Sequence, residues 1–245
     1  MATTTEHRHV DKYALLAAVP LFKDAPDHVV EVFSRASDFS VYRKGEALFL
    51  QDDPTDWFYL ILSGWVKLFR ETMDGNEAVI EIVSSGQLVA ETAIFENNEH
   101  AYSAVAIEDT GVLRLPVSAL QNAIEKDNQL ALAMLGSLSL HRKRQTREIE
   151  SLTLQNASQR IGCFLLRLCR SDDDGPIELQ LPYDKTHIAA RLGMKSETFS
   201  RALNKLRQET GITVKGATVT IPTIDVMSRF ACSGCSNEFP CDDMH

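Results

Sequence analysis

The hydrophobic pattern of this 245-residue chain changes character at Pro116. Between Phe39 and Pro116, short runs of Val, Ile, Phe, Tyr and Leu are separated by turns rich in Gly, Asp and Asn. One of these turns, Asp74-Gly75, is a strong hairpin signal because a type I′ turn needs a positive φ, which Gly adopts without strain. Regularly spaced short strands predict an antiparallel sandwich or barrel. Residues 10–35 and the chain directly after Pro116 have a helical pattern instead, so we expect the α+β class.

A long helical stretch begins at about Val117 and resumes after Asp127. Six of its residues recur at alternating spacings of three and four, as in the seam of a coiled coil. A helix buried against its own domain rarely carries Arg and Gln in mid-seam, whereas a helix facing its twin tolerates them. We therefore expect a homodimer whose interface contains Leu135, Leu138, Arg142, Gln145, Ile149 and Leu152.

The segment 185–208 predicts two helices joined by a tight turn. Lys185–Leu192 is amphipathic, Gly193-Met194-Lys195 interrupts it, and the hydroxyl of Ser196 is expected to cap the next helix. Two helices with a three-residue turn that contains Gly are typical of a helix-turn-helix. The β-prone stretch 212–221 behind them is expected to form a hairpin, or wing.

The exposed face of the second helix carries residues able to read base edges in the major groove of DNA: Lys195, Ser196, Glu197, Ser200, Arg201, Asn204 and Lys205. Arg can fork onto guanine, and Glu can accept a hydrogen bond from cytosine. Glu197 and Arg201 are four residues apart and share a face, so an ordinary surface ion pair is the alternative. The Gly-containing turn, the wing and the local charge favour DNA binding.

The charge is distributed unevenly, which matters because a net charge of -9 argues against a nucleic-acid partner. Residues 159–222 hold ten Lys and Arg against seven Asp and Glu, an excess of +3, whereas residues 1–158 carry -9 and residues 223–245 carry -3. The segment with the two helices is therefore basic inside an acidic chain.

Several stretches resemble the cyclic-AMP receptor protein/FNR family of bacterial transcription regulators: Leu21-Phe22, Lys44-Gly45-Glu46, Phe58-Tyr59-Leu60-Ile61-Leu62-Ser63-Gly64, Val66-Lys67-Leu68 and Glu197-Thr198-Phe199-Ser200-Arg201. The resemblance implies a β-roll (jelly-roll) sensor at 1–126, a dimerisation helix at 127–155, a winged helix-turn-helix at 156–225 and a Cys-rich tail at 226–245. It also implies that Glu197, Ser200 and Arg201 read TTGA-type palindromes and that RNA polymerase is the partner of an activator.

The sensor lacks the residues that hold a cyclic phosphate in this family. The corresponding stretches read Ala90-Glu91-Thr92-Ala93-Ile94-Phe95 and Glu99-His100-Ala101-Tyr102-Ser103, with no Arg or Lys between Arg70 and Arg114. A buried phosphate without a cation would be costly. We therefore expect that cyclic AMP is not the ligand.

Ala90-Glu91 and the stretch 148–157 are most similar to the Dnr-type branch, which implies a nitric-oxide signal received through haem. An axial ligand would come from His7, His9, His28, His100, His141 or His187, none of them placed by a motif; each of these is otherwise a plain surface histidine. The N-terminal cysteines that hold an iron–sulfur cluster in FNR itself are absent, because the first cysteine is Cys163.

Three cysteines lie close together in the tail: Cys232, Cys235 and Cys241. This spacing suits a metal or an iron–sulfur cluster if a fourth ligand is added, for which Asp242, Asp243, His245 or the long helix are options. The alternatives are a disordered tail with unbound thiols or a regulatory disulfide. Cys163 and Cys169, on an apolar helix face, are expected in the core.

Other classes of protein are disfavoured. A cupin-like metal enzyme needs a cluster of His and carboxylate on the strands, but His100 is the only histidine between Val41 and Pro116. The helix with Glu197 and Arg201 opposes a cyclic-nucleotide-binding module without DNA function. No apolar run approaches the roughly 20 residues of a membrane helix, and residues 1–9 lack a signal-peptide core. We expect a cytoplasmic regulator that is not an enzyme.

Overall fold

The computed structural model describes residues 11–75, 77–95, 99–169, 175–236 and 239–241. The chain divides into two compact units, Met1–Leu140 and His141–His245, and the long helix α4, Asn128–Leu154, runs from the first into the second. The expected α+β class with antiparallel sheets is confirmed. None of the described helices combines the length and the apolar character that a membrane crossing requires.

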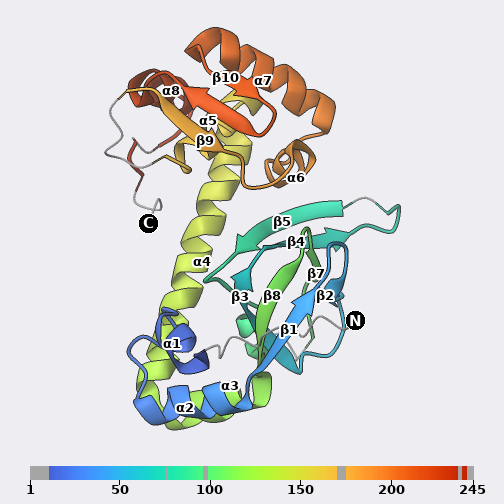
Figure 1. Cartoon of the computed structure of the whole chain (residues 1–245), viewed down its shortest axis with the longest axis vertical. Coiled ribbons are helices and arrows are strands. Elements are labelled where there is room, and N and C mark those ends of the chain that lie inside the picture. Colours follow the sequence, from blue (N-terminus) through green and yellow to red (C-terminus); the bar gives the residue numbers. More distant parts are fainter. Residues whose placement is uncertain (1–10, 76, 96–98, 170–174, 237–238, 242–245) are drawn as a thin grey trace, which may run out of the picture. The chain divides into compact units, whose positions relative to one another are not determined.

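The first unit contains a β-roll of two four-stranded antiparallel sheets, in the orders β1-β8-β3-β6 and β2-β7-β4-β5 (Figure 1). Its strands are β1 Asp38–Tyr42, β2 Ala47–Phe49, β3 Trp57–Ser63, β4 Trp65–Glu71, β5 Glu77–Ser84, β6 Leu88–Val89, β7 Ser103–Ala106 and β8 Thr110–Pro116. The short 3-10 helix η1, Glu91–Phe95, follows β6. Gly75, in the turn between β4 and β5, has φ of +75°, as the hairpin signal predicts.

Two helices precede the β-roll, α1 at Lys12–Ala17 and α2 at Asp27–Ala36. The expectation of helix throughout 10–35 is therefore wrong between them. Pro20 and Pro26 lie in this break, and a proline disfavours helical backbone in the residue before it. Residue 10 lies outside the described residues.

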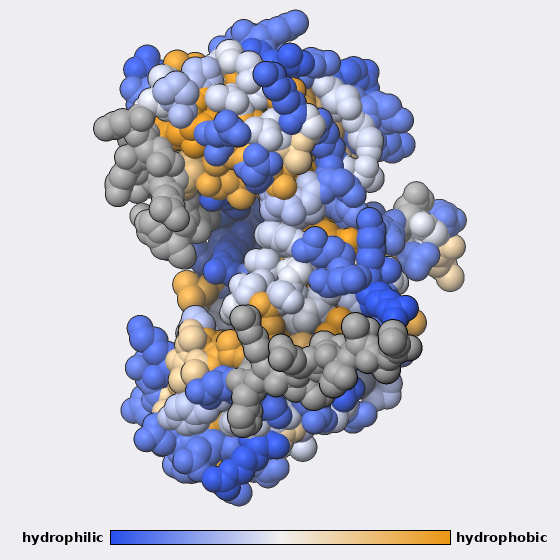
Figure 2. All heavy atoms as spheres, viewed as in Figure 1, coloured by the Kyte–Doolittle hydropathy of each residue, from blue (hydrophilic) through white to orange (hydrophobic). Residues whose placement is uncertain are grey.

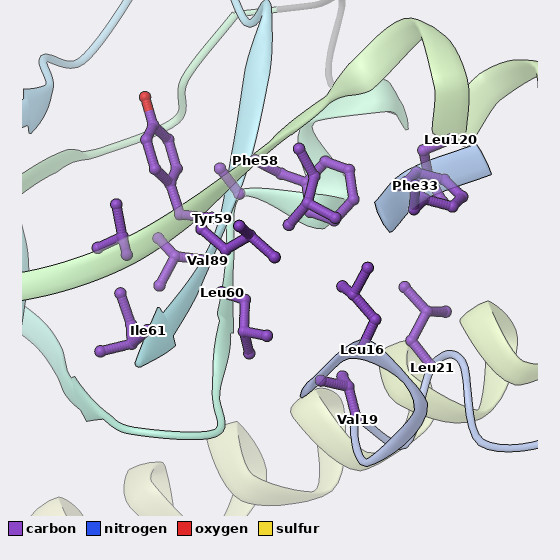
Figure 3. Close-up of a cluster of buried hydrophobic side chains, with 14 of the residues drawn as sticks. Leu16, Val19, Leu21, Phe33, Phe58, Tyr59, Leu60, Ile61, Val89 and Leu120 are labelled. Carbon is purple, nitrogen blue, oxygen red and sulfur yellow. The ribbon is translucent and has the colours of Figure 1, made fainter. Parts of the chain in front are cut away.

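The core of the first unit joins these helices to strand β3. The ring centroids of Phe22 and Phe33 lie 4.9 Å apart, and those of Phe33 and Phe58 lie 6.1 Å apart. Figure 3 shows this cluster, in which Leu16 from α1 and Leu120 from α3 (Val117–Lys126) join the same apolar group. Leu130 and Met134 at the start of α4 are also buried in it.

The second unit is a winged helix-turn-helix followed by one more helix. Its elements are α5 Ala157–Leu166, β9 Ile177–Gln180, α6 Lys185–Arg191, α7 Ser196–Thr210, β10 Thr213–Lys215, β11 Thr218–Ile221 and α8 Ile224–Cys232 (Figure 1). The wing is confirmed as an antiparallel hairpin of β10 and β11, and β9 adds a third strand beside β11. Helix α5 ends at Leu166, and residues 170–174 lie outside the described residues.

Candidate nucleic-acid interface

The turn between α6 and α7 is built on Gly193. Its φ is +63°, the left-handed region that Gly adopts most readily. The N–H of Met194 donates to the carbonyl oxygen of Ala189 at 3.0 Å, and the small Ala189 side chain is buried. The turn therefore ends α6 sharply and starts α7 after two more residues.

Helix α7 begins one residue earlier than the capping prediction required. Lys195 occupies the N-cap with extended backbone and makes no side-chain cap, whereas Ser196 is the first helical residue. The prediction that the Ser196 hydroxyl caps the helix is wrong, because extended dihedrals at Lys195 already place Ser196 inside the helix. Its carbonyl oxygen accepts a hydrogen bond from the Ser200 hydroxyl at 3.0 Å.

Helix α7 is amphipathic, with a buried side formed by Phe199, Ala202, Leu206 and Thr210. The hydroxyl of Ser158 on α5 donates to the carbonyl oxygen of Ala202 at 3.0 Å, which holds the buried side against α5. All the residues predicted to face DNA lie on the exposed side: Lys195, Ser196, Glu197, Ser200, Arg201, Asn204 and Lys205.

Glu197 and Arg201 are both described, and the structure has no ion pair between them. The alternative reading of this pair as a surface salt bridge therefore has no support, and both charged groups face solvent. Asn204 differs, because its Oδ1 accepts a hydrogen bond from the guanidinium of Arg207 at 3.5 Å.

A shallow groove runs beside α7, and the start of α5 forms its other side, which the sequence did not predict. Its lining residues are Asn156, Ala157, Ser158, Thr198, Arg201, Ala202 and Lys205. Asn156 and Gln159 form a capping box at the start of α5, a motif that was readable in the sequence. The groove sets the N-terminus of α5 beside the cations of Arg201 and Lys205, an arrangement that suits a phosphate.

All six residues of the expected dimer seam lie on α4. Leu135 is 61% exposed and Ile149 is 65% exposed, and Leu132, Leu140, Leu152 and Leu154 are also exposed large apolar residues of this helix. Hydrophobic residues, orange in Figure 2, reach the surface in both units. Large apolar side chains exposed on one helix are costly in water and are typical of an interface.

The sensor presents a buried histidine where the family resemblance places a ligand site. His100 is 3% exposed, and its ring stacks on Phe49 with centroids 3.7 Å apart and an interplanar angle of 12°. Burial lowers the pKa of His100, and the charge of Asp53 opposes this shift. The neutral imidazole that results is the form that binds a metal. In this conformation, however, the ring is not accessible to a group as large as haem.

The other candidate haem ligands lie in different settings. His28 is exposed on α2, and His141 and His187 are half-buried in the second unit. His7 and His9 lie outside the described residues. The stretch from Ala90 to Ser103 contributes the buried Glu91 but no Arg or Lys, so the sequence argument against a cyclic phosphate applies to this site.

The tail cysteines do not form a metal centre within the described part of the chain. No group of three or more His, Cys, Asp or Glu is placed there to hold a metal ion. Cys235 and Cys241 line a small cavity together with Cys163 of α5, whereas Cys232 is not among its lining residues. Cys169 is in the core as expected, but Cys163 is only partly buried. Asp242, Asp243 and His245 lie outside the described residues.

Comparison with known proteins places these two units in one family. The sequence model of the cyclic nucleotide-binding domain matches residues 39–127, and that of the Crp-like helix-turn-helix domain matches residues 159–230. The chain is 28% identical to the cyclic AMP receptor protein of Thermus thermophilus over 86% of this chain and 96% of that one. It is 30% identical to the fumarate and nitrate reduction regulatory protein of Shigella dysenteriae over 77% of this chain and 76% of that one.

The crystal structure of DNR from Pseudomonas aeruginosa is similar with a TM-score of 0.50 and 28% identity, covering 94% of this chain and 100% of that chain. Regulators with this helix-turn-helix bind DNA and form dimers. The matched domains, their order and the similarity to these relatives show that the chain belongs to the cyclic-AMP receptor protein/FNR family of DNA-binding transcription regulators.

Proposed function

We propose that this regulator binds TTGA-type palindromes as a homodimer, with one α7 in the major groove of each half-site. Glu197, Ser200 and Arg201 contact base edges, and Lys195, Ser196 and Asn204 contact the adjoining groove or backbone. The observation that carries this proposal is the exposed, unpaired Glu197 and Arg201 at the start of α7. A carboxylate and a guanidinium without partners on the protein are available for cytosine and guanine.

Dimerisation follows from the exposed seam of α4, from Leu135 to Leu152. Two recognition helices related by a two-fold axis can read a palindrome when they lie about one turn of DNA apart. A signal in the β-roll would change how the α4 helices pack and so change that spacing. We propose that the protein acts in the cytoplasm as an activator that engages RNA polymerase.

The DNA proposal is tested by fluorescence anisotropy of a labelled TTGA palindrome and a scrambled duplex at fixed salt. Arg201→Ala is expected to weaken palindrome binding by roughly 1–3 kcal/mol and to relax the preference at one base pair per half-site. Arg207→Ala, on the same helix, is expected to leave the base preference intact. If wild type and Arg201→Ala prefer the palindrome over the scrambled duplex to the same extent, Arg201 does not read a base.

We propose nitric oxide, or the redox or oxygen state, as the signal, received through haem, and no cyclic nucleotide as the ligand. The support is the similarity to the Pseudomonas aeruginosa DNR and the neutral, buried His100. If haem binds at His100, its iron would supply the site for a diatomic gas, and such binding requires an accessible His100 ring, which the stacking on Phe49 does not provide in this conformation. A Soret band in anaerobically purified protein that shifts with nitric oxide, and is lost in His100→Phe, is the expected result; a flat spectrum would contradict it.

A second candidate for the signal is an iron–sulfur cluster or a thiol switch on Cys232, Cys235 and Cys241. The cavity that contains Cys235 and Cys241 favours the thiol version. A cluster does not fit the described arrangement, because Cys232 does not line this cavity and no three ligating residues converge in the described residues.

A further inference from the structure

The segment after α8 is hydrogen-bonded to α5 at Ser233 and to α4 at Ser236. The side-chain amide of Gln159 donates to the Ser233 hydroxyl at 2.9 Å. The carboxylate of Glu150 accepts from the backbone N–H of Ser236 at 2.8 Å, and hydrogen bonds from Ser236 lower the pKa of Glu150. Cys235 lies between these two anchors and is therefore held at the surface of α4 and α5.

Cys163 lies on the same side of α5 as one of these anchors. It follows Gln159 by four residues, and residues spaced in this way lie on one face of a helix. A Cβ added to Gly234 would lie 3.0 Å from the side-chain oxygen of Gln159, so the tail backbone passes directly over this face. Cys163 and Cys235, 72 positions apart in the sequence, thus line one cavity, which Cys241 lines as well.

The size of the cavity limits which molecule can reach the thiols. Its volume is about 20 Å³, which is room for about one water molecule. An iron–sulfur cluster is larger than this, whereas hydrogen peroxide has only one heavy atom more than a water molecule. Two cations, Arg147 and Arg167, and the carboxylate of Glu150 also line the cavity.

We propose that Cys163 and Cys235 form a peroxide-sensitive thiol pair, which closes a disulfide between α5 and the segment after α8. The Cys235 thiolate attacks one oxygen of the hydroperoxide, and the O–O bond breaks to leave a sulfenic acid and hydroxide. The Cys163 thiolate then attacks that sulfur and displaces the second hydroxide as the S–S bond forms. Two thiols lose two electrons, hydrogen peroxide gains them, and two water molecules result.

The bond would enclose almost the whole DNA-binding unit. The chain between Cys163 and Cys235 contains the last residues of α5, then α6, α7, the wing and α8. A disulfide that closes a long loop stabilises the folded state by restricting the unfolded chain. Oxidation is therefore expected to raise the thermal unfolding midpoint of this unit by about 5 °C or more, and dithiothreitol is expected to reverse the rise.

The experiment treats the full reduced protein with one equivalent of hydrogen peroxide and blocks remaining thiols with N-ethylmaleimide. Trypsin places Cys163 in peptide 161–167, Cys169 in 168–170 and all three tail cysteines in 230–245. The expected product is peptide 161–167 linked to peptide 230–245, and fragmentation of the linked pair is expected to assign the bond to Cys235. The midpoint is measured on the same samples without DNA, so failure of the DNA assignment leaves the result unaffected.

Serine variants test whether the disulfide forms between Cys163 and Cys235 and not with another cysteine. Cys163→Ser and Cys235→Ser are expected to lose both the linked peptide and the midpoint shift. The matched control, Cys232→Ser, changes a tail cysteine that does not line the cavity and should behave as wild type. A bond within peptide 230–245 alone, a bond to Cys169, or iron or zinc that protects the thiols of purified wild type would each overturn the proposal.

Discussion

The carboxylate of Glu148 and the guanidinium of Arg191 lie 2.7 Å apart and join the C-terminal part of α4 to α6. Both side chains are about three-quarters buried, at 27% and 20% exposure, so solvent screens this pair less than it screens a surface ion pair. The pair therefore connects the proposed dimer helix to the first helix of the helix-turn-helix within one unit.

We expect the double-mutant cycle of Glu148→Gln, Arg191→Met and the combined variant to give a coupling energy of about 1–2 kcal/mol in urea unfolding. Each single variant removes one member of this ion pair and keeps the other, partly buried charge, so the combined variant should be less destabilised than the sum of the two. Additive losses would mean that the two groups do not interact in solution.

The turn of the helix-turn-helix touches the same helix. Gly193→Ala and Gly216→Ala both place a side chain on a backbone with positive φ, of +63° and +62°. Both variants should therefore lose about 1–2 kcal/mol in urea unfolding. Only Gly193→Ala adds a Cβ within 3.0 Å of the Leu152 side chain, whereas nothing lies within 4 Å at Gly216.

Because Leu152 belongs to the proposed seam, Gly193→Ala should also weaken dimerisation, which sedimentation velocity over a concentration series measures. Gly216→Ala provides the control for backbone strain alone and should keep the wild-type dimer. If the two variants sediment identically, the contact between position 193 and Leu152 does not affect dimerisation.

The seam itself is tested at its most exposed apolar position. Ile149→Asp places a charge where the two copies of α4 are expected to meet, so it should give a monomer at micromolar concentration. Lys143→Asp changes an exposed residue of the same helix outside the seam and should leave the dimer intact. A dimer that survives Ile149→Asp would require another interface.

Much of this structure followed from local sequence patterns. The β-roll strands, the wing and the two helices around Gly193 were predicted because alternation, helical spacing and positive-φ turns are properties of neighbouring residues. The exposed side of α7 followed in the same way, since Phe199 and Leu206 fix which face is buried. The break between α1 and α2 was missed, although Pro20 and Pro26 signalled it.

Contacts between distant residues had no such signal. The Ser158 hydroxyl reaches the Ala202 carbonyl across 44 positions, and this bond sets the start of α5 beside α7. The meeting of Cys163 with the tail depends in the same way on how α5 and α8 pack, where Gly162 allows a close approach to Ala231. Hydrophobic periodicity predicted that these helices exist but not which of their residues meet.

The groove beside α7 gives a prediction that separates backbone contacts from base contacts. Lys205 lines this groove with the start of α5, so we expect it to contact a phosphate. Lys205→Ala should weaken palindromic and scrambled duplexes about equally and make the slope of log K against log salt shallower by about 1. Lys126→Ala, at an exposed position of α3, should change neither quantity. A selective loss on the palindrome would instead make Lys205 a base-reading residue.

Burial of His100 makes the stability of the first unit depend on pH. Because burial lowers its pKa below the 6.5 of a free histidine, the unfolded chain takes up a proton at a higher pH than the folded chain. The unfolded state therefore binds more protons below about pH 6.5, and stability falls with pH until His100 titrates in the folded state as well. Above pH 7.5 this contribution is absent.

We expect His100→Phe, which keeps an aromatic ring against Phe49, to remove this dependence. Between pH 7.5 and 5.5 the free energy of unfolding of wild type should fall relative to that of the variant by up to about 1 kcal/mol. His28→Gln, at an exposed position on α2, is the matched control and should follow wild type. If wild type and His100→Phe differ by a constant amount across this range, His100 is not held neutral by burial, and its proposed role as a ready metal ligand loses its physical basis.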